Sequence, residues 1–100
     1  MNYRDVTESA PVVPVEFYAS WCPHCRHMMP IVAEIKELLE GQLKVEQFDI
    51  DENQDLAGEA GVTGVPTFLL YVDGEEVWRH SGEMSGEELL RNIQSNIGGR

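Results

Sequence analysis

The chain is short of basic residues, with 7 Lys and Arg against 18 Asp and Glu, which gives a net charge of −11 over 100 residues. Nucleic acids and anionic membrane surfaces bind clustered Lys and Arg, so this composition disfavours both kinds of partner. No apolar run approaches the roughly 18 residues that cross a membrane. Residues 1–10 also lack the apolar segment of a secretory signal peptide. We therefore expect a cytoplasmic protein.

Cysteine is equally scarce. The two cysteines, Cys22 and Cys25, both lie in the stretch "WCPHC" at 21–25. In a reducing compartment, Cys-x-x-Cys is more often redox-active or metal-binding than a structural bridge. His24 and His27 could add ligands, but the second ligand pair of a zinc site is absent at the usual separation. We expect no metal and no other cofactor, and we interpret the cysteines as a reacting pair.

The length and a hydrophobic content of 42% fit a single domain over residues 1–100. Residues 2–9 form either a short helix or an irregular lead-in. The sequence pattern predicts strands at 12–19, 43–50, 67–72 and 75–80, and helices at 23–40, at 52–60 and from Ser85 to Gly98. Two strand–helix connections imply parallel pairing of the first two strands, and the Asp73–Gly74 turn implies an antiparallel hairpin. We predict an α/β fold with a mixed four-stranded sheet flanked by helices on both faces.

The 23–40 segment changes from strand to helix periodicity. Its expected apolar face consists of Met28, Ile31, Val32, Ile35, Leu38 and Leu39. Pro30 lies inside this pattern, and the stripe continues beyond it, so the helix is expected to continue as well. Gly41 is the expected C-cap of this helix. In the preceding strand, Pro14 is expected near the beginning or on a sheet edge.

Cys22 comes directly before Pro23, and proline is favoured at the first position of a helix. Cys22 is thus expected at the N-cap, where free backbone N–H groups and the helix dipole stabilise a thiolate. His24 adds a titratable positive charge nearby, so the pKa of Cys22 should lie below that of a free thiol. Cys25 lies one turn further along and faces inward. This asymmetry predicts that Cys22 attacks a disulfide and that Cys25 then displaces the product.

Four features together resemble the thioredoxin family: "VEFYASWCPHC" at 15–25, Pro30 five residues after Cys25, "GVPT" at 64–67 and "DGEEV" at 73–77. The resemblance covers residues 2–97 and implies a thioredoxin-like fold. Only twenty residues precede Trp21, so the first strand of the family is expected to be missing. The resemblance implies a monomeric protein-disulfide oxidoreductase that acts on disulfide-containing substrate proteins and is recycled by a thioredoxin reductase.

The resemblance also implies roles for residues around the cysteines. Trp21 would flank the nucleophile and shape the contact surface. Pro66 would be cis and pack against the cysteine pair, and the backbone of Val65 would pair with an extended substrate segment. Gly64 and Gly82 would leave a flat docking patch around the reactive sulfur.

Glu16 is the one charged residue in an otherwise apolar strand. A buried carboxylate, usually Asp, stands at this place in thioredoxins and exchanges a proton with the second cysteine. Burial raises the pKa of a carboxyl, which suits that role. In the alternative, simple strand alternation turns Val15, Phe17 and Ala19 inward and Glu16 outward.

The dipeptide Pro23–His24 differs from the Gly-Pro that thioredoxins usually carry, and it resembles that of bacterial periplasmic disulfide oxidases. We therefore interpret the chain as an atypical thioredoxin with a WCPHC active site. Two alternatives remain open. One is a more oxidising protein that acts as a disulfide oxidase or isomerase. The other is a redox-gated binding module, in which the disulfide only switches the affinity for a partner.

Overall fold

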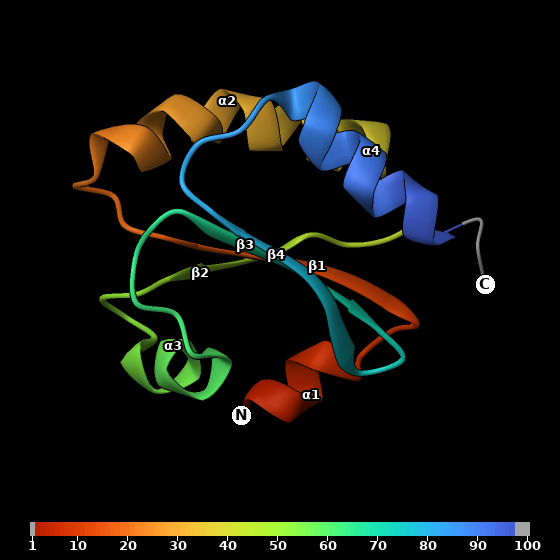
Figure 1. The fold of residues 1–100 in the computed structure, drawn as a ribbon, viewed down its shortest axis with the longest axis horizontal. Coiled ribbons are helices and arrows are strands. Elements are labelled where there is room, and N and C mark those ends of the chain that lie inside the picture. The colour runs from red at the N-terminus through yellow and green to blue at the C-terminus, as the bar shows by residue number, and fades with distance from the viewer. Residues whose placement is uncertain (1, 98–100) are drawn as a thin grey trace.

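The computed structural model describes residues 2–97, which form four helices and four strands (Figure 1). In chain order these are α1 Tyr3–Thr7, β1 Val12–Tyr18, α2 Pro23–Leu38, β2 Glu46–Asp49, α3 Gln54–Ala60, β3 Thr67–Val72, β4 Glu75–Ser81 and α4 Gly86–Ile97. Residues 2–9 thus contain a short helix, and within the described range no strand precedes it. Gly98, the expected end of the last helix, lies outside the described residues.

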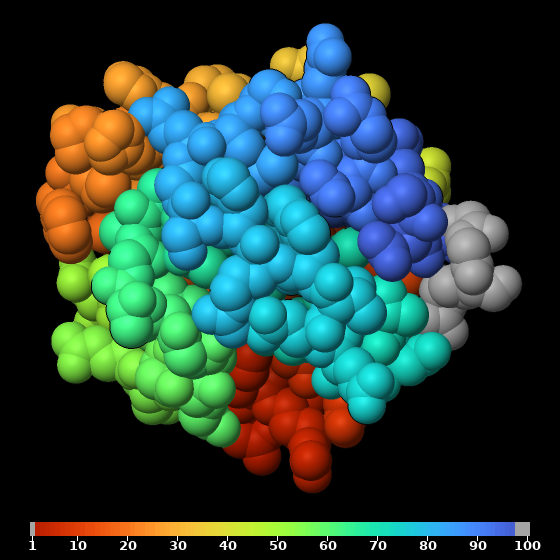
Figure 2. Space-filling view, viewed as in Figure 1, coloured from red at the N-terminus to blue at the C-terminus, as the bar shows by residue number. Residues whose placement is uncertain are grey.

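The four strands form one sheet in the order β2-β1-β3-β4. β1 pairs with β2 in parallel and with β3 antiparallel, and β3–β4 is an antiparallel hairpin at one edge. Helices α2 and α4 cover one face of the sheet, and α1 and α3 cover the other (Figure 1). In the space-filling view, the orange start of α2 borders the light-blue segment that joins β4 to α4 (Figure 2). The predicted α/β architecture with a mixed four-stranded sheet is confirmed.

Strand β1 lies in the middle of the sheet and is buried on both faces from its first residue to Phe17. Pro14 lies near its beginning, as expected. β2 pairs only with Val15 and the later residues of β1, and the first pair of this parallel ladder is Val15–Glu46. Pro14 has no N–H to donate to a neighbouring strand, so the parallel ladder begins after it. This explains why β2 is shorter than the predicted strand at 43–50.

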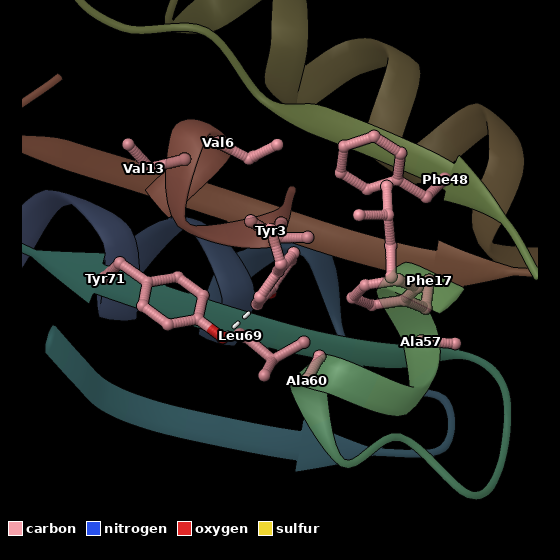
Figure 3. Packing of buried hydrophobic residues seen from close by; sticks show 11 residues of the cluster. Tyr3, Val6, Val13, Phe17, Phe48, Ala57, Ala60, Leu69 and Tyr71 are labelled. Carbon is pink, nitrogen blue, oxygen red and sulfur yellow. Dashed lines mark hydrogen bonds between the residues drawn. The ribbon is translucent and has the colours of Figure 1, made fainter. Parts of the chain in front are cut away.

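The core on the α1/α3 face is rich in aromatic side chains (Figure 3). The Phe17 ring lies 5.8 Å from the ring of Tyr3 and 5.6 Å from that of Phe48, measured between ring centroids. The Tyr3 hydroxyl donates a hydrogen bond of 2.8 Å to the hydroxyl of Tyr71 in β3. A helix of five residues is not stable alone. These tertiary contacts hold α1 in place.

The core on the other face is built mainly by α2 and α4. Four residues of the expected α2 stripe are buried in it: Met28, Val32, Ile35 and Leu39. Leu38 was expected there too, but it lies at the edge of the stripe and is 56% exposed. The helix continues through Pro30, as expected.

The end of α2 differs from the prediction. The helix ends at Leu38 with Leu39 as its C-cap, so Gly41 lies two residues beyond the cap. The last turn tightens, because the Glu40 N–H donates to the carbonyl of Glu37, three residues earlier. Gly41 then has a φ of +86°, a conformation that favours glycine. It reverses the chain after the cap.

The β3–β4 hairpin forms as predicted. Asp73 and Gly74 have φ values of +52° and +83°, as in the type I′ turn that suits the twist of two antiparallel strands. The register of the two strands shifts between Leu70 and Tyr71, which marks an irregularity in the ladder. In α3, the C-cap is Gly61 in the left-handed conformation, directly after the end of the predicted helix at 52–60.

Within residues 2–97, no helix is long and apolar enough to cross a membrane. The cytoplasmic location and the monomeric state stay predictions.

Two adjacent leucines at the end of α2 provide a matched test of the packing. Leu39 is fully buried and Leu38 is largely exposed. We expect Leu39→Ala to lower the free energy of unfolding by about 2–5 kcal/mol, because it leaves a cavity in the core. Leu38→Ala should change it by less than about 0.5 kcal/mol. Urea unfolding of both variants measures the difference, and equal losses would contradict the assignment of these side chains.

Candidate active site

Cys22 lies at the junction between β1 and α2. It is the N-cap of α2, with φ −85° and ψ 121°, and Pro23 occupies the first helical turn, as predicted. The Cys22 N–H donates to the Ala19 carbonyl over 3.2 Å, and the Cys22 carbonyl accepts from the N–H of Arg26 over 3.0 Å. The short loop and the first helical bond together fix the sulfur at the N-terminal end of α2.

The pKa of Cys22 lies below the ordinary value of a thiol. The largest cause is the nearby backbone N–H of Cys25, and the Cys25 thiol, the backbone N–H of His24 and the charge of Arg26 lower the pKa further, while burial opposes them. The Cys22 side chain forms no capping hydrogen bond with these N–H groups, so they act on the sulfur as nearby dipoles. The helix N-terminus therefore stabilises a thiolate at this position.

Cys25 has a contrasting environment. It is 1% exposed, and its sulfur accepts a hydrogen bond of 3.4 Å from the N–H of Ala19. Burial is the main cause that raises the pKa of Cys25 to about 11, and the nearby Cys22 and Glu16 raise it further, against the effect of the Ala19 bond. Both cysteines are free thiols in the structure. One sulfur is thus suited to ionise first while the other keeps its proton.

The segment before β3 lies against the sulfur of Cys22. The Val65–Pro66 peptide bond is cis, as expected. The Cys22 thiol donates a long hydrogen bond of 3.8 Å to the carbonyl oxygen of Val65. Pro66 is buried, and its carbonyl accepts a bond of 2.8 Å from the N–H of Gly82. Gly64 is exposed beside them. The fold therefore brings Val65 next to Cys22, with Gly64 and Pro66 as its chain neighbours and with Gly82 bonded to Pro66.

Trp21 lies on the surface immediately before the nucleophile and is 61% exposed. Its indole N–H donates a hydrogen bond of 2.9 Å to Asp51 Oδ2 in the loop between β2 and α3. Asp51 was not among the predicted site residues, because nothing in its own neighbourhood connects it with residue 21.

The imidazole of His24 contacts a carboxylate. Its Nδ1 forms a short hydrogen bond with Glu83 Oε2, and His27 Nδ1 lies 3.2 Å from the same oxygen. Hydrogen bonds from His24 and then His27 hold the pKa of Glu83 below its usual value. The sequence analysis missed Glu83, which lies 59 residues from His24. It also missed Arg26, although this charge stands directly after Cys25 and could have been found.

Glu16 is 3% exposed and lies on the α2/α4 face of the sheet, opposite to Val15 and Phe17. The alternative that turned Glu16 to solvent is wrong, because helices cover both faces. Its Oε1 accepts a hydrogen bond of 2.9 Å from Gln47 Nε2, and Gln47 Oε1 accepts one of 2.9 Å from Lys36. Burial raises the pKa of Glu16, although Gln47 and Lys36 lower it. The carboxyl is thus linked by two side chains to the exposed Lys36 amine.

Comparisons with known proteins agree with this geometry. The sequence profile of the thioredoxin family matches residues 2–95. A thioredoxin of Pseudomonas aeruginosa is 35% identical over 94 residues, which cover 94% of this chain and 87% of that protein. Among solved structures, a mutant thioredoxin from Halobacterium salinarum is 41% identical with a TM-score of 0.77, covering 92% of this chain and 80% of that one. Oxidised mitochondrial thioredoxin 3 from Saccharomyces cerevisiae is 28% identical with a TM-score of 0.83, covering 94% and 90%.

The two thiols should differ in reactivity. At about pH 7, we expect iodoacetamide to alkylate Cys22 at least about tenfold faster than Cys25, because alkylation requires a thiolate and the pKa of Cys22 is lowered while that of Cys25 is raised. Cys22 is also slightly more exposed, at 6% against 1%. Peptide mass spectrometry of the reduced protein at short reaction times measures both rates. In denaturant the rates should converge. Equal rates in the folded protein would contradict the assigned environments.

The buried carboxyl predicts a pH dependence of stability. The folded pKa of Glu16 is raised above 4.5, so the folded state holds this proton more tightly and stability falls as pH rises from there. Glu16→Gln removes this loss, so the free energy of unfolding of this variant should rise relative to that of the wild type as pH increases above the ordinary pKa of a glutamate. Urea unfolding at several pH values measures the difference.

Glu76 provides a control of opposite sign. Its pKa is lowered, chiefly by the hydrogen bond from Arg79, so its contribution to stability is present above the ordinary pKa and is lost as pH falls. Glu76→Gln should therefore lose stability relative to the wild type as pH rises. A pH-independent effect of Glu16→Gln would show that the Glu16 carboxyl is not perturbed by burial.

Proposed function

The chain belongs to the thioredoxin family, and from this membership we propose that it reduces the disulfide bonds of other proteins through Cys22 and Cys25. It is a thiol–disulfide oxidoreductase with a Cys-x-x-Cys pair. The observation that carries the proposal is geometric. The sulfur of Cys22 lies at the N-terminus of α2, with the buried Cys25 one helical turn behind it.

The reaction follows from this arrangement. The Cys22 thiolate attacks one sulfur of a substrate disulfide and forms a mixed disulfide, while the other substrate sulfur leaves as a thiolate and takes up a proton. Cys25 then loses its proton and attacks the Cys22 sulfur, so the second substrate sulfur leaves. The substrate gains two electrons and two protons. The chain is left with a Cys22–Cys25 disulfide.

Glu16 is proposed as the acceptor of the Cys25 proton. Three observations support this role: the carboxyl is buried, its charge raises the pKa of Cys25, and its own pKa is raised. A raised pKa lets a carboxylate take up a proton near neutrality. The bonds to Gln47 and onward to Lys36 would hold the carboxyl in position.

The surface around Cys22 is proposed as the docking site for an extended substrate segment. Trp21 is exposed on one side, and the backbone of Val65 lies beside the reactive sulfur. Main-chain hydrogen bonds to such a segment give affinity without demanding one sequence. Gly64 and Gly82 carry no side chains that would obstruct the substrate segment. The buried Pro66 would hold the backbone of Val65 in position.

The remaining parts of the proposal come from the family. We propose that a thioredoxin reductase returns the oxidised pair to the dithiol form. We also propose that residues 1–100 act as a single monomeric domain, an atypical thioredoxin whose active site reads WCPHC. Disulfide-containing proteins are its proposed substrates.

A second candidate function rests on the Pro23–His24 dipeptide. Stabilising the Cys22 thiolate also stabilises the reduced form, which makes the pair a stronger oxidant. The protein would then act as a disulfide oxidase or isomerase. A reduction potential close to that of the glutathione pool or above it would favour this function, and one far below would exclude it.

Turnover of insulin disulfides with a thioredoxin reductase and NADPH tests the proposed function. We expect catalytic reduction by the wild type, complete loss in Cys22→Ser, and accumulation of a mixed disulfide in Cys25→Ser, because that variant lacks the displacing thiol. NADPH oxidation and non-reducing gel electrophoresis measure the three outcomes. No turnover by wild type with intact thiols would contradict the proposal. Tight non-covalent binding of a partner that survives Cys25→Ser, with no turnover by the wild type, would instead indicate a redox-gated binding module.

A further inference from the structure

Three side chains that the proposed disulfide chemistry does not use converge beside the start of α2. These are His24, His27 and Glu83, and all three are exposed. The Nδ1 atoms of both imidazoles face the same carboxylate oxygen, Glu83 Oε2, with His27 at 3.2 Å. The three possible ligand atoms lie within 4.8 Å of one another.

The fold positions these residues from two distant segments. His24 and His27 are three residues apart on α2, which places both side chains on one face of the helix. Glu83 lies in the segment between β4 and α4, next to the start of α2 (Figure 2). That segment is anchored on both sides of Glu83. The N–H of Gly82 donates to Pro66, and the Ser85 hydroxyl accepts the N–H of Glu88 in α4.

We propose that His24, His27 and Glu83 bind one divalent transition-metal cation of the class that prefers imidazole ligands, with Zn²⁺ as its representative. Two histidines and one carboxylate are a ligand set that suits such cations. With bonds of about 2.0–2.1 Å, neighbouring ligand atoms in a tetrahedral zinc site lie about 3.3 Å apart. The 3.2 Å between His27 Nδ1 and Glu83 Oε2 matches this spacing, whereas His24 Nδ1 lies 2.5 Å from the same oxygen and must move away from it when a cation binds between them.

The surroundings favour a cation as well. The three side chains are exposed, so they can adjust their rotamers by the small amount that a regular site requires. Three protein ligands leave one tetrahedral position open to water or to an exchangeable ligand. The net charge of −11 raises the local concentration of cations near the surface.

The cysteine thiols would compete for the same metals, so the test must separate the two sites. The double variant Cys22→Ser/Cys25→Ser removes both thiols and leaves the three proposed ligands unchanged. It also makes the metal site independent of the proposed function, because this variant has no disulfide chemistry. Failure of one proposal then leaves the other untouched.

Calorimetric titration of this double variant with Zn²⁺ measures the stoichiometry and the affinity. We expect one equivalent to bind. Adding His24→Ala, His27→Ala or Glu83→Gln to the double variant should weaken binding at least about tenfold, since even outer contacts of a metal site contribute about 10–100-fold. Glu87→Gln is a matched control outside the cluster and should keep the affinity. Circular dichroism confirms that each variant is folded.

The imidazole nitrogens locate the bound cation. In ¹⁵N spectra, Zn²⁺ should shift the Nδ1 resonances of His24 and His27 much more than the resonances of His80, whose Nε2 lies 3.2 Å from the carbonyl of Glu83. Absence of saturable binding, or unchanged affinity in His27→Ala and Glu83→Gln, would overturn the proposal. Equal shifts at all three histidines would overturn it too, because they would indicate adventitious binding along the acidic surface.

Discussion

The backbone N–H groups in the first turn of α2 lower the pKa of Cys22, and the central part of the sheet determines where that turn lies. β1 is one of the two strands with neighbours on both sides, and it delivers the chain directly into the loop before Cys22. The lowered pKa of Cys22 depends on this junction between β1 and α2. Helices on both faces hold β1 rigid, so the loop and the helix start cannot drift apart.

The two cysteines show how three residues of separation produce two chemical environments. Cys22 meets the N-terminal end of the helix and the substrate-facing surface. Cys25 points from the same helix into the interior, toward Ala19 and the charge of Glu16. Burial destabilises a thiolate because it removes solvating water, and nearby N–H donors restore part of the lost stabilisation. The balance between these effects differs at the two sulfurs, so their order of ionisation is a property of the fold.

Local patterns in the sequence were sufficient for much of this structure. The Pro23 start of α2 and the Asp73–Gly74 turn each depend on a few adjacent residues, and both were predicted correctly. The cis Pro66 was expected from the resemblance to thioredoxins and is also observed. Leu38 was assigned to the core wrongly. Helical periodicity predicts which side of a helix is apolar, but it does not predict how far burial extends around that side. The contacts of Trp21 with Asp51 and of His24 with Glu83 join separate loops. Only the tertiary fold brings such pairs together, and no local pattern signals them.

The two outer strands of the sheet each have a feature that discourages self-association. β2 contributes only four residues, which is too short to template pairing with a second molecule. β4 is longer, but it presents Glu75, Glu76 and Arg79 to solvent, and its ladder to β3 is irregular at Leu70. Charges and irregularities of this kind oppose the docking of a foreign strand. The Pro14 that shortens β2 thus also protects the molecule from aggregation through its parallel edge.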